Sequence, residues 1–60
     1  MFIAIIEDKD AEWVYEGEVQ GQPIWVARKD ARPKLLTEKE ALTIARRDSF
    51  SGELARAERA

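Results

Sequence analysis

The fold of this protein is decided by the stretch TEKEALTIARR, residues 37–47, which has the pattern of one amphipathic helix. Thr37 can cap the helix, and Glu40 completes a capping box by accepting a hydrogen bond from the backbone N–H of the cap. Ala41 and Ala45 then lie on one narrow apolar stripe. Because these side chains are so small, that side of the helix is suited to lie close against a flat surface.

The residues before this helix have the composition of β-strands separated by polar turns. Residues 2–6 and 24–28 are apolar runs, and residues 11–16 are rich in β-forming side chains. Gly17 predicts a β-bulge that lets the second strand continue to Val19. The sequence therefore predicts an α+β fold, a three-stranded antiparallel meander followed by one main helix packed on one face.

The length of 60 residues predicts a single small domain, which we place at residues 1–48. Residues 49–60 are expected to be a C-terminal extension, which is a short helix, a continuation of the first helix or a frayed tail. The core is small, and the chain has no Cys and no His, so disulfides and the usual zinc ligands are excluded. Self-association or a permanent partner is the stabilising device that remains, and we expect no cofactor and no metal.

The first residues of the chain, 1–6, are apolar but too short to span a membrane. They also lack the basic start of a signal peptide. The absence of cysteine fits a reducing compartment. We therefore expect a cytoplasmic protein that makes no membrane contact.

The net charge of −2 conceals a separation of charges along the chain. Residues 1–22 carry six acidic residues against one lysine, whereas residues 23–47 carry seven basic residues against three acidic ones. One interpretation is an ordinary surface with attraction between the two halves. The other is a two-signed surface that steers a partner.

The alternation of side chains divides the predicted sheet into two faces. A tight first hairpin places Ile3 opposite Val14, and the second hairpin places Tyr15 opposite Val26. The face expected under the helix collects Phe2, Ala4, Ile6, Trp13, Tyr15, Ile24 and Val26. The outer face collects Ile3, Ile5, Val14, Trp25 and Ala27, with the acids Glu12, Glu16 and Glu18. Since one helix cannot cover both faces, we expect the outer face to be an exposed, partly apolar interaction surface.

Trp25 is the centre of that expected surface, with Glu16 and Glu18 beside it. Tryptophan is enriched at the centres of protein interfaces, so Trp25 is a candidate hot spot. It is equally typical of a protein core, and the sequence leaves both interpretations open.

A basic connector, residues 28–34, forms the second candidate contact and offers Arg28, Lys29 and Arg32. It suits a protein partner, or alternatively a nucleic acid whose phosphates meet the basic side chains while Trp25 stacks on a base. Asp30 interrupts the run and the whole chain is acidic, so we expect no general nucleic-acid binding.

Catalytic residues are scarce in this sequence. Without His or Cys, the familiar pairs of nucleophile and base cannot be built. The acidic turn at residues 8–12 resembles the start of a calcium loop but has Trp13 where that loop needs glycine. We therefore expect a binding protein and no enzyme.

The segment ARPKLLTEKEA, residues 31–41, resembles a stretch found in small proteins of phages and other mobile elements, in which a meander and a basic connector precede a capped helix. That broad group includes anti-CRISPR proteins and other inhibitors of bacterial defence complexes. The resemblance implies a non-enzymatic inhibitor that binds a protein complex of the host. The alternative is a small nucleic-acid-associated or host-regulatory protein that uses the basic connector.

Overall fold

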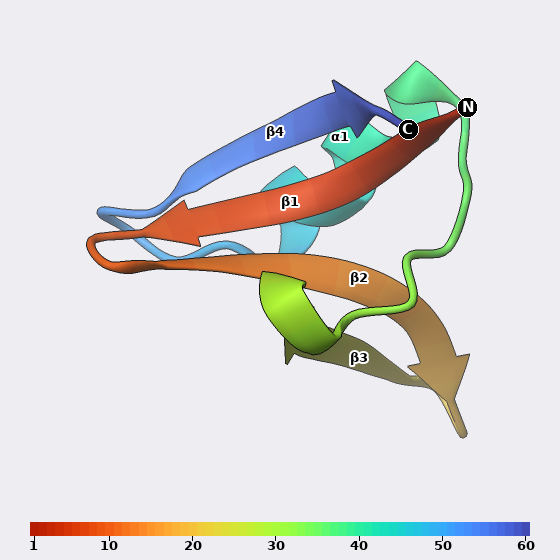
Figure 1. The fold of residues 1–60 in the computed structure, drawn as a ribbon, viewed down its shortest axis with the longest axis horizontal. Helices are drawn as coiled ribbons and strands as arrows, with labels where there is room; N and C mark the ends of the chain where they lie inside the picture. Colours follow the sequence, from red (N-terminus) through yellow and green to blue (C-terminus); the bar gives the residue numbers. More distant parts are fainter.

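The computed structural model describes residues 1–60 and shows a single antiparallel sheet with one α-helix against it (Figure 1). Its strands lie in the spatial order β3-β2-β1-β4. The elements are β1 (Phe2–Asp8), β2 (Ala11–Val19), β3 (Gln22–Ala27), the short 3-10 helix η1 (Arg28–Asp30), α1 (Glu38–Asp48) and β4 (Leu54–Arg59). The predicted α+β class is therefore confirmed, although the sheet has four strands and not three.

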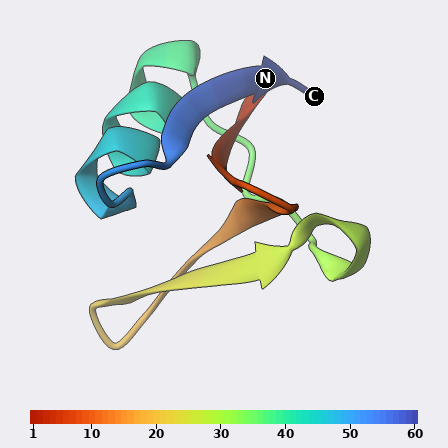
Figure 2. The same ribbon diagram turned by 90° about the vertical axis from the view of Figure 1, so that its left-hand side faces the viewer.

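The helix α1 begins with the predicted capping box. Glu40 N donates a hydrogen bond to Thr37 Oγ1 (3.1 Å), and Thr37 N donates one to Glu40 Oε1 (3.0 Å). Ala41 and Ala45 are fully buried where α1 packs on β1 and β4 (Figure 2). Ala4 is also fully buried in this cluster. Small side chains on both surfaces thus let the helix lie close to the sheet, as the alanine stripe predicted.

The fourth strand, β4, overturns the prediction of a short helix or a frayed tail for the C-terminal residues. It pairs with β1 along nearly its whole length, from Phe2 opposite Arg59 to Glu7 opposite Leu54. The helix-forming residues of this segment adopt a strand because β1 offers a free row of backbone hydrogen-bonding groups. As a result β1 is an interior strand, and the edges of the sheet are β3 and β4.

The first hairpin has a register two residues away from the predicted one. Ile5, and not Ile3, lies opposite Val14. Because side chains alternate with a period of two, this shift leaves every side chain of β1 on its predicted face.

The second hairpin contains the predicted bulge, and the bulge changes which side chains of β3 face the helix. The register shifts between Tyr15 and Gly17, so that Tyr15 lies opposite Trp25 and not opposite Val26. Gly17 has a φ of +123°, which favours glycine. One extra residue in β2 reverses the alternation of β3, which places Trp25 on the side of α1.

The outer face of the sheet, opposite α1, is crossed by the chain that follows β3 (Figures 1 and 2). Its later residues pair with the sheet through the backbone: Lys34 N donates a hydrogen bond to Tyr15 O (3.1 Å), and Leu36 forms a β-bridge with Phe2 while its side chain is buried in the core beneath α1. Ala31 packs on the apolar residues of this face. The start of the connector therefore covers part of the outer face, and its end joins the sheet.

Candidate functional site

The three aliphatic residues predicted to lie exposed on the outer face are buried. Ile3 is 6% exposed, and Ile5 and Val14 are not exposed at all. They form an apolar cluster of their own, against which Ala31 of the connector packs. The prediction of an open apolar patch here is therefore wrong, because the connector and charged side chains cover a face that the helix leaves free.

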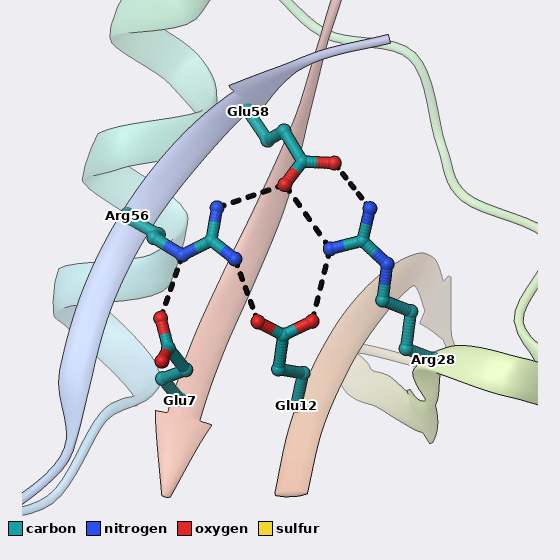
Figure 3. Close-up of polar contacts among 5 residues, drawn as sticks. All are labelled: Glu7, Glu12, Arg28, Arg56 and Glu58. Carbon is teal, nitrogen blue, oxygen red and sulfur yellow. Dashed lines mark hydrogen bonds and ion pairs between the residues drawn. The ribbon is translucent and has the colours of Figure 1, made fainter.

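The charged cover is a network of five side chains from three strands and η1 (Figure 3). We call it the charged network, and its members are Glu7, Glu12, Arg28, Arg56 and Glu58. Arg56 donates from Nε to Glu7 Oε1 (2.8 Å), from Nη2 to Glu12 Oε2 (2.7 Å) and from Nη1 to Glu58 Oε1 (2.9 Å). Arg28 donates from Nη1 to Glu12 Oε1 (3.0 Å) and Glu58 Oε1 (3.1 Å), and from Nη2 to Glu58 Oε2. Since Arg56 lies directly opposite Ile5 on the next strand, the network lies over the outer apolar cluster.

The two arginines of this network bind all three of its glutamates. Hydrogen bonds first from Arg28 and then from Arg56 lower the pKa of Glu58 to about 2. Hydrogen bonds from Arg56 and Arg28 also lower the pKa of Glu12. A general acid or base works best with a pKa near the working pH, so these carboxylates are poorly suited to proton transfer at neutral pH. The network is better explained as a structural cover than as a catalytic group.

The basic connector is only partly available for contact. Arg28 is held by Glu12 and Glu58 in the charged network. Lys29 and Arg32 are exposed. The structure therefore does not bring the three predicted basic residues together as one free patch.

Glu16 and Glu18, which were predicted to flank Trp25 on the outer face, are on opposite sides of the sheet. Glu16 Oε2 accepts a hydrogen bond from Arg32 N (2.6 Å) where the connector crosses the outer face. Glu18 Oε2 lies 3.7 Å from Nη2 of Arg47, a residue of α1. Residues two apart in a regular strand share a face, and the bulge between these two glutamates separates them.

Trp25 lies on the side of α1 and not on the outer face, which corrects the predicted position. Its ring centroid is 5.3 Å from that of Tyr15, with the ring planes tilted by 54°. Its indole Nε1 donates a hydrogen bond to Asp48 Oδ2 (2.9 Å) at the end of α1. Trp25 is thus half-buried at the border of the main core.

A hollow of about 170 Å³ lies beside Trp25, between the end of α1 and the part of the sheet that the helix leaves uncovered. We call it the aromatic hollow. Its lining consists of Ile6, Trp13, Trp25, Asp48, Phe50 and Glu53. The Trp13 residue is 37% exposed and Phe50 is 79% exposed. Three large aromatic residues from β2, β3 and the loop after α1 therefore meet at one place on the surface.

The position of Phe50 is set by a tight turn between α1 and β4. Phe50 N donates a hydrogen bond to Glu53 Oε1 (2.6 Å), and Glu53 N donates one to Phe50 O (3.0 Å). Gly52 completes the turn with a φ of +91°. The turn leaves the Phe50 side chain in solvent, although its backbone is held at both ends.

The two carboxylates of the hollow differ in how far they are already paired. Asp48 accepts hydrogen bonds from Nε (2.8 Å) and Nη2 (3.0 Å) of Arg47 and from Trp25 Nε1, and first Arg47 and then Trp25 lower its pKa. Glu53 binds the turn through Oε1 alone. Glu53 therefore carries the unpaired negative charge at this site.

The sequence interpretation missed Trp13 and Phe50 as site residues. Trp13 was assigned to the helix-covered face, and Phe50 fell in the C-terminal extension of residues 49–60, to which no binding role was given. The available signal was an aromatic residue in the polar segment Ser49–Glu53, where burial gives no reason for one. That signal alone does not show which other side chains lie near it.

The aromatic hollow presents aromatic and acidic side chains to a molecule that contacts it. The chain has no His or Cys, and no group of acidic side chains lies close enough together to hold a metal ion. The 11-residue helix α1 does not meet the length and apolarity needed to cross a bilayer. Comparisons with protein-family models, curated proteins and solved structures give no match to this chain.

Proposed function

We propose that this protein is a non-enzymatic protein-binding module whose contact surface is centred on the aromatic hollow. The observation that carries the proposal is the meeting of Trp13, Trp25 and Phe50 around a surface hollow that α1 does not cover. Tryptophan and phenylalanine are enriched in the buried centres of interfaces, and tryptophan is common among hot-spot residues. The proposed partner-binding surface therefore lies on the helix side of the sheet and not on the outer face, which is covered.

The size and exposure of the hollow favour a protein partner over a small ligand. Pockets for drug-sized molecules usually measure about 300–1,000 Å³, whereas this one measures about 170 Å³. Phe50 remains 79% exposed, and burying such a side chain contributes about 1.5–3 kcal/mol. A partner surface that covers the hollow and Phe50 together therefore gains most from this site.

An affinity pull-down from bacterial lysate, read by mass spectrometry, tests the proposal with Phe50→Ala as the decisive variant. Its side chain is mostly in solvent, so the substitution should leave the fold intact. Leu35→Ala is the matched control, because Leu35 is 52% exposed and lies outside the hollow. We expect Phe50→Ala to lose the partner and Leu35→Ala to keep it. Equal recovery with both variants would place the contact elsewhere.

A more specific proposal is that the partner is a bacterial defence complex, such as a CRISPR effector in the cytoplasm, and that the protein inhibits it. The support is the resemblance of residues 31–41 to small mobile-element proteins. Recovery of such a complex in the pull-down, with inhibition of its activity in vitro, is the expected result. Recovery of a ribosome or a polymerase instead would indicate a host regulator.

Self-association is a further proposal that follows from the small core and the free edge strands. Strand β3 is an edge of the sheet, and edge strands can pair with a second chain. Pro23 weakens this edge because it has no N–H to donate. Light scattering at high micromolar concentration measures the oligomeric state, and a clean monomer would leave a different protein as the partner.

The alternative function, nucleic-acid association through the basic connector, is favoured by the exposure of Lys29, Arg32 and Lys34. It is opposed by the pairing of Arg28 with two glutamates. A gel shift with duplex and single-stranded probes at low salt should show no tight binding. Submicromolar binding that is lost on substitution of Arg32 and Lys34 by alanine would support the alternative.

A further inference from the structure

We propose that the aromatic hollow receives the side chain of a lysine or arginine from the partner protein. This inference rests on the proposed function and adds the chemistry of the partner, a segment with an exposed basic residue. It draws on the lining of the hollow, its size and its unpaired charge.

The lining combines aromatic rings with negative charge. Trp13, Trp25 and Phe50 line one small volume together with Ile6, and Asp48 and Glu53 lie beside them. Cations are attracted to the faces of aromatic rings, most strongly to tryptophan. A cation inserted here can interact with an aromatic ring and a carboxylate at once, whereas an anion would face like charge.

The unpaired charge at Glu53 selects a cation over a neutral apolar side chain. Glu53 Oε1 accepts the hydrogen bond from Phe50 N, and Oε2 has no hydrogen-bond partner in the protein. An apolar side chain in the hollow would remove water from this oxygen without replacing its hydrogen bond, which is unfavourable. A lysine ammonium or an arginine guanidinium would supply that hydrogen bond as well as the compensating charge.

The neighbouring Arg47 does not already occupy the site. Its Nε and Nη2 donate to Asp48, and its Nη2 lies 3.7 Å from Glu18. Arg47 is not among the residues that line the hollow. The chain therefore neutralises Asp48 from the side of α1 and leaves Glu53 for an external cation.

The volume fits the end of one long side chain. The hollow of about 170 Å³ has room for more than one water molecule. A whole helix or a nucleobase stack would not enter such a space. The remainder of the partner would lie over the exposed rim formed by Phe50 and Trp13.

Titration of the full chain with short glycine-flanked peptides, followed by ¹⁵N–¹H NMR, tests the proposal. The chain has two tryptophans, so the two indole N–H signals report on the hollow directly. The probes are peptides with one lysine, one acetyl-lysine or one norleucine. We expect the lysine peptide to shift both indole signals at millimolar concentration and to bind more tightly than the two neutral peptides.

Glu53→Gln keeps the shape of the side chain and removes its charge. We expect it to weaken binding of the lysine peptide by about 1.4- to five-fold, which is the range of an exposed ion pair, and not to weaken the norleucine peptide, which then desolvates a neutral amide in place of a charge. Glu38→Gln is the matched control, because it removes the same charge from an exposed residue at the start of α1. Added salt should weaken the lysine peptide alone.

The proposal would be overturned by equal binding of the neutral peptides, by equal loss in the two glutamine variants, or by the absence of an indole shift with the lysine peptide. Indole signals that move with protein concentration alone would also overturn it, since a second copy would then occupy the hollow. If Phe50→Ala still loses the partner in the pull-down, the proposed function stands and only the cationic chemistry is refuted.

Discussion

Substitution of Ile5 by valine tests whether the outer face of the sheet is a covered core or an open surface. Ile5 has no exposed surface and lies between Val14 on β2 and Arg56 on β4. Removing one buried methylene costs about 0.8 kcal/mol in transfer free energy, and measured values for this exchange run about 0.5–1.5 kcal/mol. We therefore expect Ile5→Val to lower the free energy of unfolding by about 1 kcal/mol.

Urea denaturation followed by tryptophan fluorescence measures this loss, and thermal unfolding should show a decrease in Tm of about 4–8 °C. Ile5→Ala should cost about 2–5 kcal/mol. That is a large share of the roughly 3–9 kcal/mol expected for the whole 60-residue domain. The valine variant is thus the one that keeps a measurable folded state.

Leu54→Ala is the matched control on the same side of the sheet. Leu54 lies opposite Glu7 on β4 and is 58% exposed, so its truncation should change stability by no more than about 0.5 kcal/mol. If the two variants lost the same stability, or if Ile5→Val lost none, the outer face would not be a covered core. The connector and the charged network would then not be the cover of this face.

Three further predictions concern the backbone, the helix cap and the charged network. Gly17→Ala should destabilise the fold by about 1–3 kcal/mol in urea denaturation, because a φ of +123° is strained for any residue other than glycine. The new Cβ has room, since the nearest atom, Lys34 Cδ, would lie 3.8 Å away, so the cost comes from the backbone. An unchanged urea midpoint would argue against the bulge. Thr37→Ala should cost about 1 kcal/mol and Thr37→Ser much less, since serine retains the capping oxygen; equal losses would exclude the hydrogen bond as the cause. The pKa of Glu58 in the folded protein is about 2, below its ordinary value of 4.5. Its contribution to the free energy of unfolding is therefore complete above pH 4.5 and is lost as the pH falls toward 2. The urea midpoint should fall across this pH range, and it should fall less steeply for Arg56→Met.

The sequence by itself determined α1 because the interactions that define it are local. The capping box joins Thr37 to a residue three positions later, and Ala41 and Ala45 share a face by helical spacing alone. The bulge at Gly17 was also readable, since it depends on the conformation of one residue. The sequence likewise predicted the α+β class from the change between strand and helix periodicity.

Only the tertiary structure decided the fourth strand. The β4 segment is rich in alanine, arginine and glutamate, which favour helices in isolation. Its pairing joins Phe2 to Arg59, almost the full length of the chain apart. No local pattern in the sequence predicts such a contact. The alternation of Ala55 and Ala57 with charged residues indicates a strand only when β1 is known to lie beside it.

The candidate site depended on tertiary structure for the same reason. The face of Trp25 was reversed by one extra residue in β2, because a strand has a period of two and any odd shift exchanges its faces. Trp13 and Phe50 come from distant parts of the chain and meet Trp25 only because α1 packs mainly on β1 and β4 and leaves Trp13 of β2 partly exposed. The sequence thus determined the elements through local interactions, whereas the surface they leave open was decided by how those elements pack.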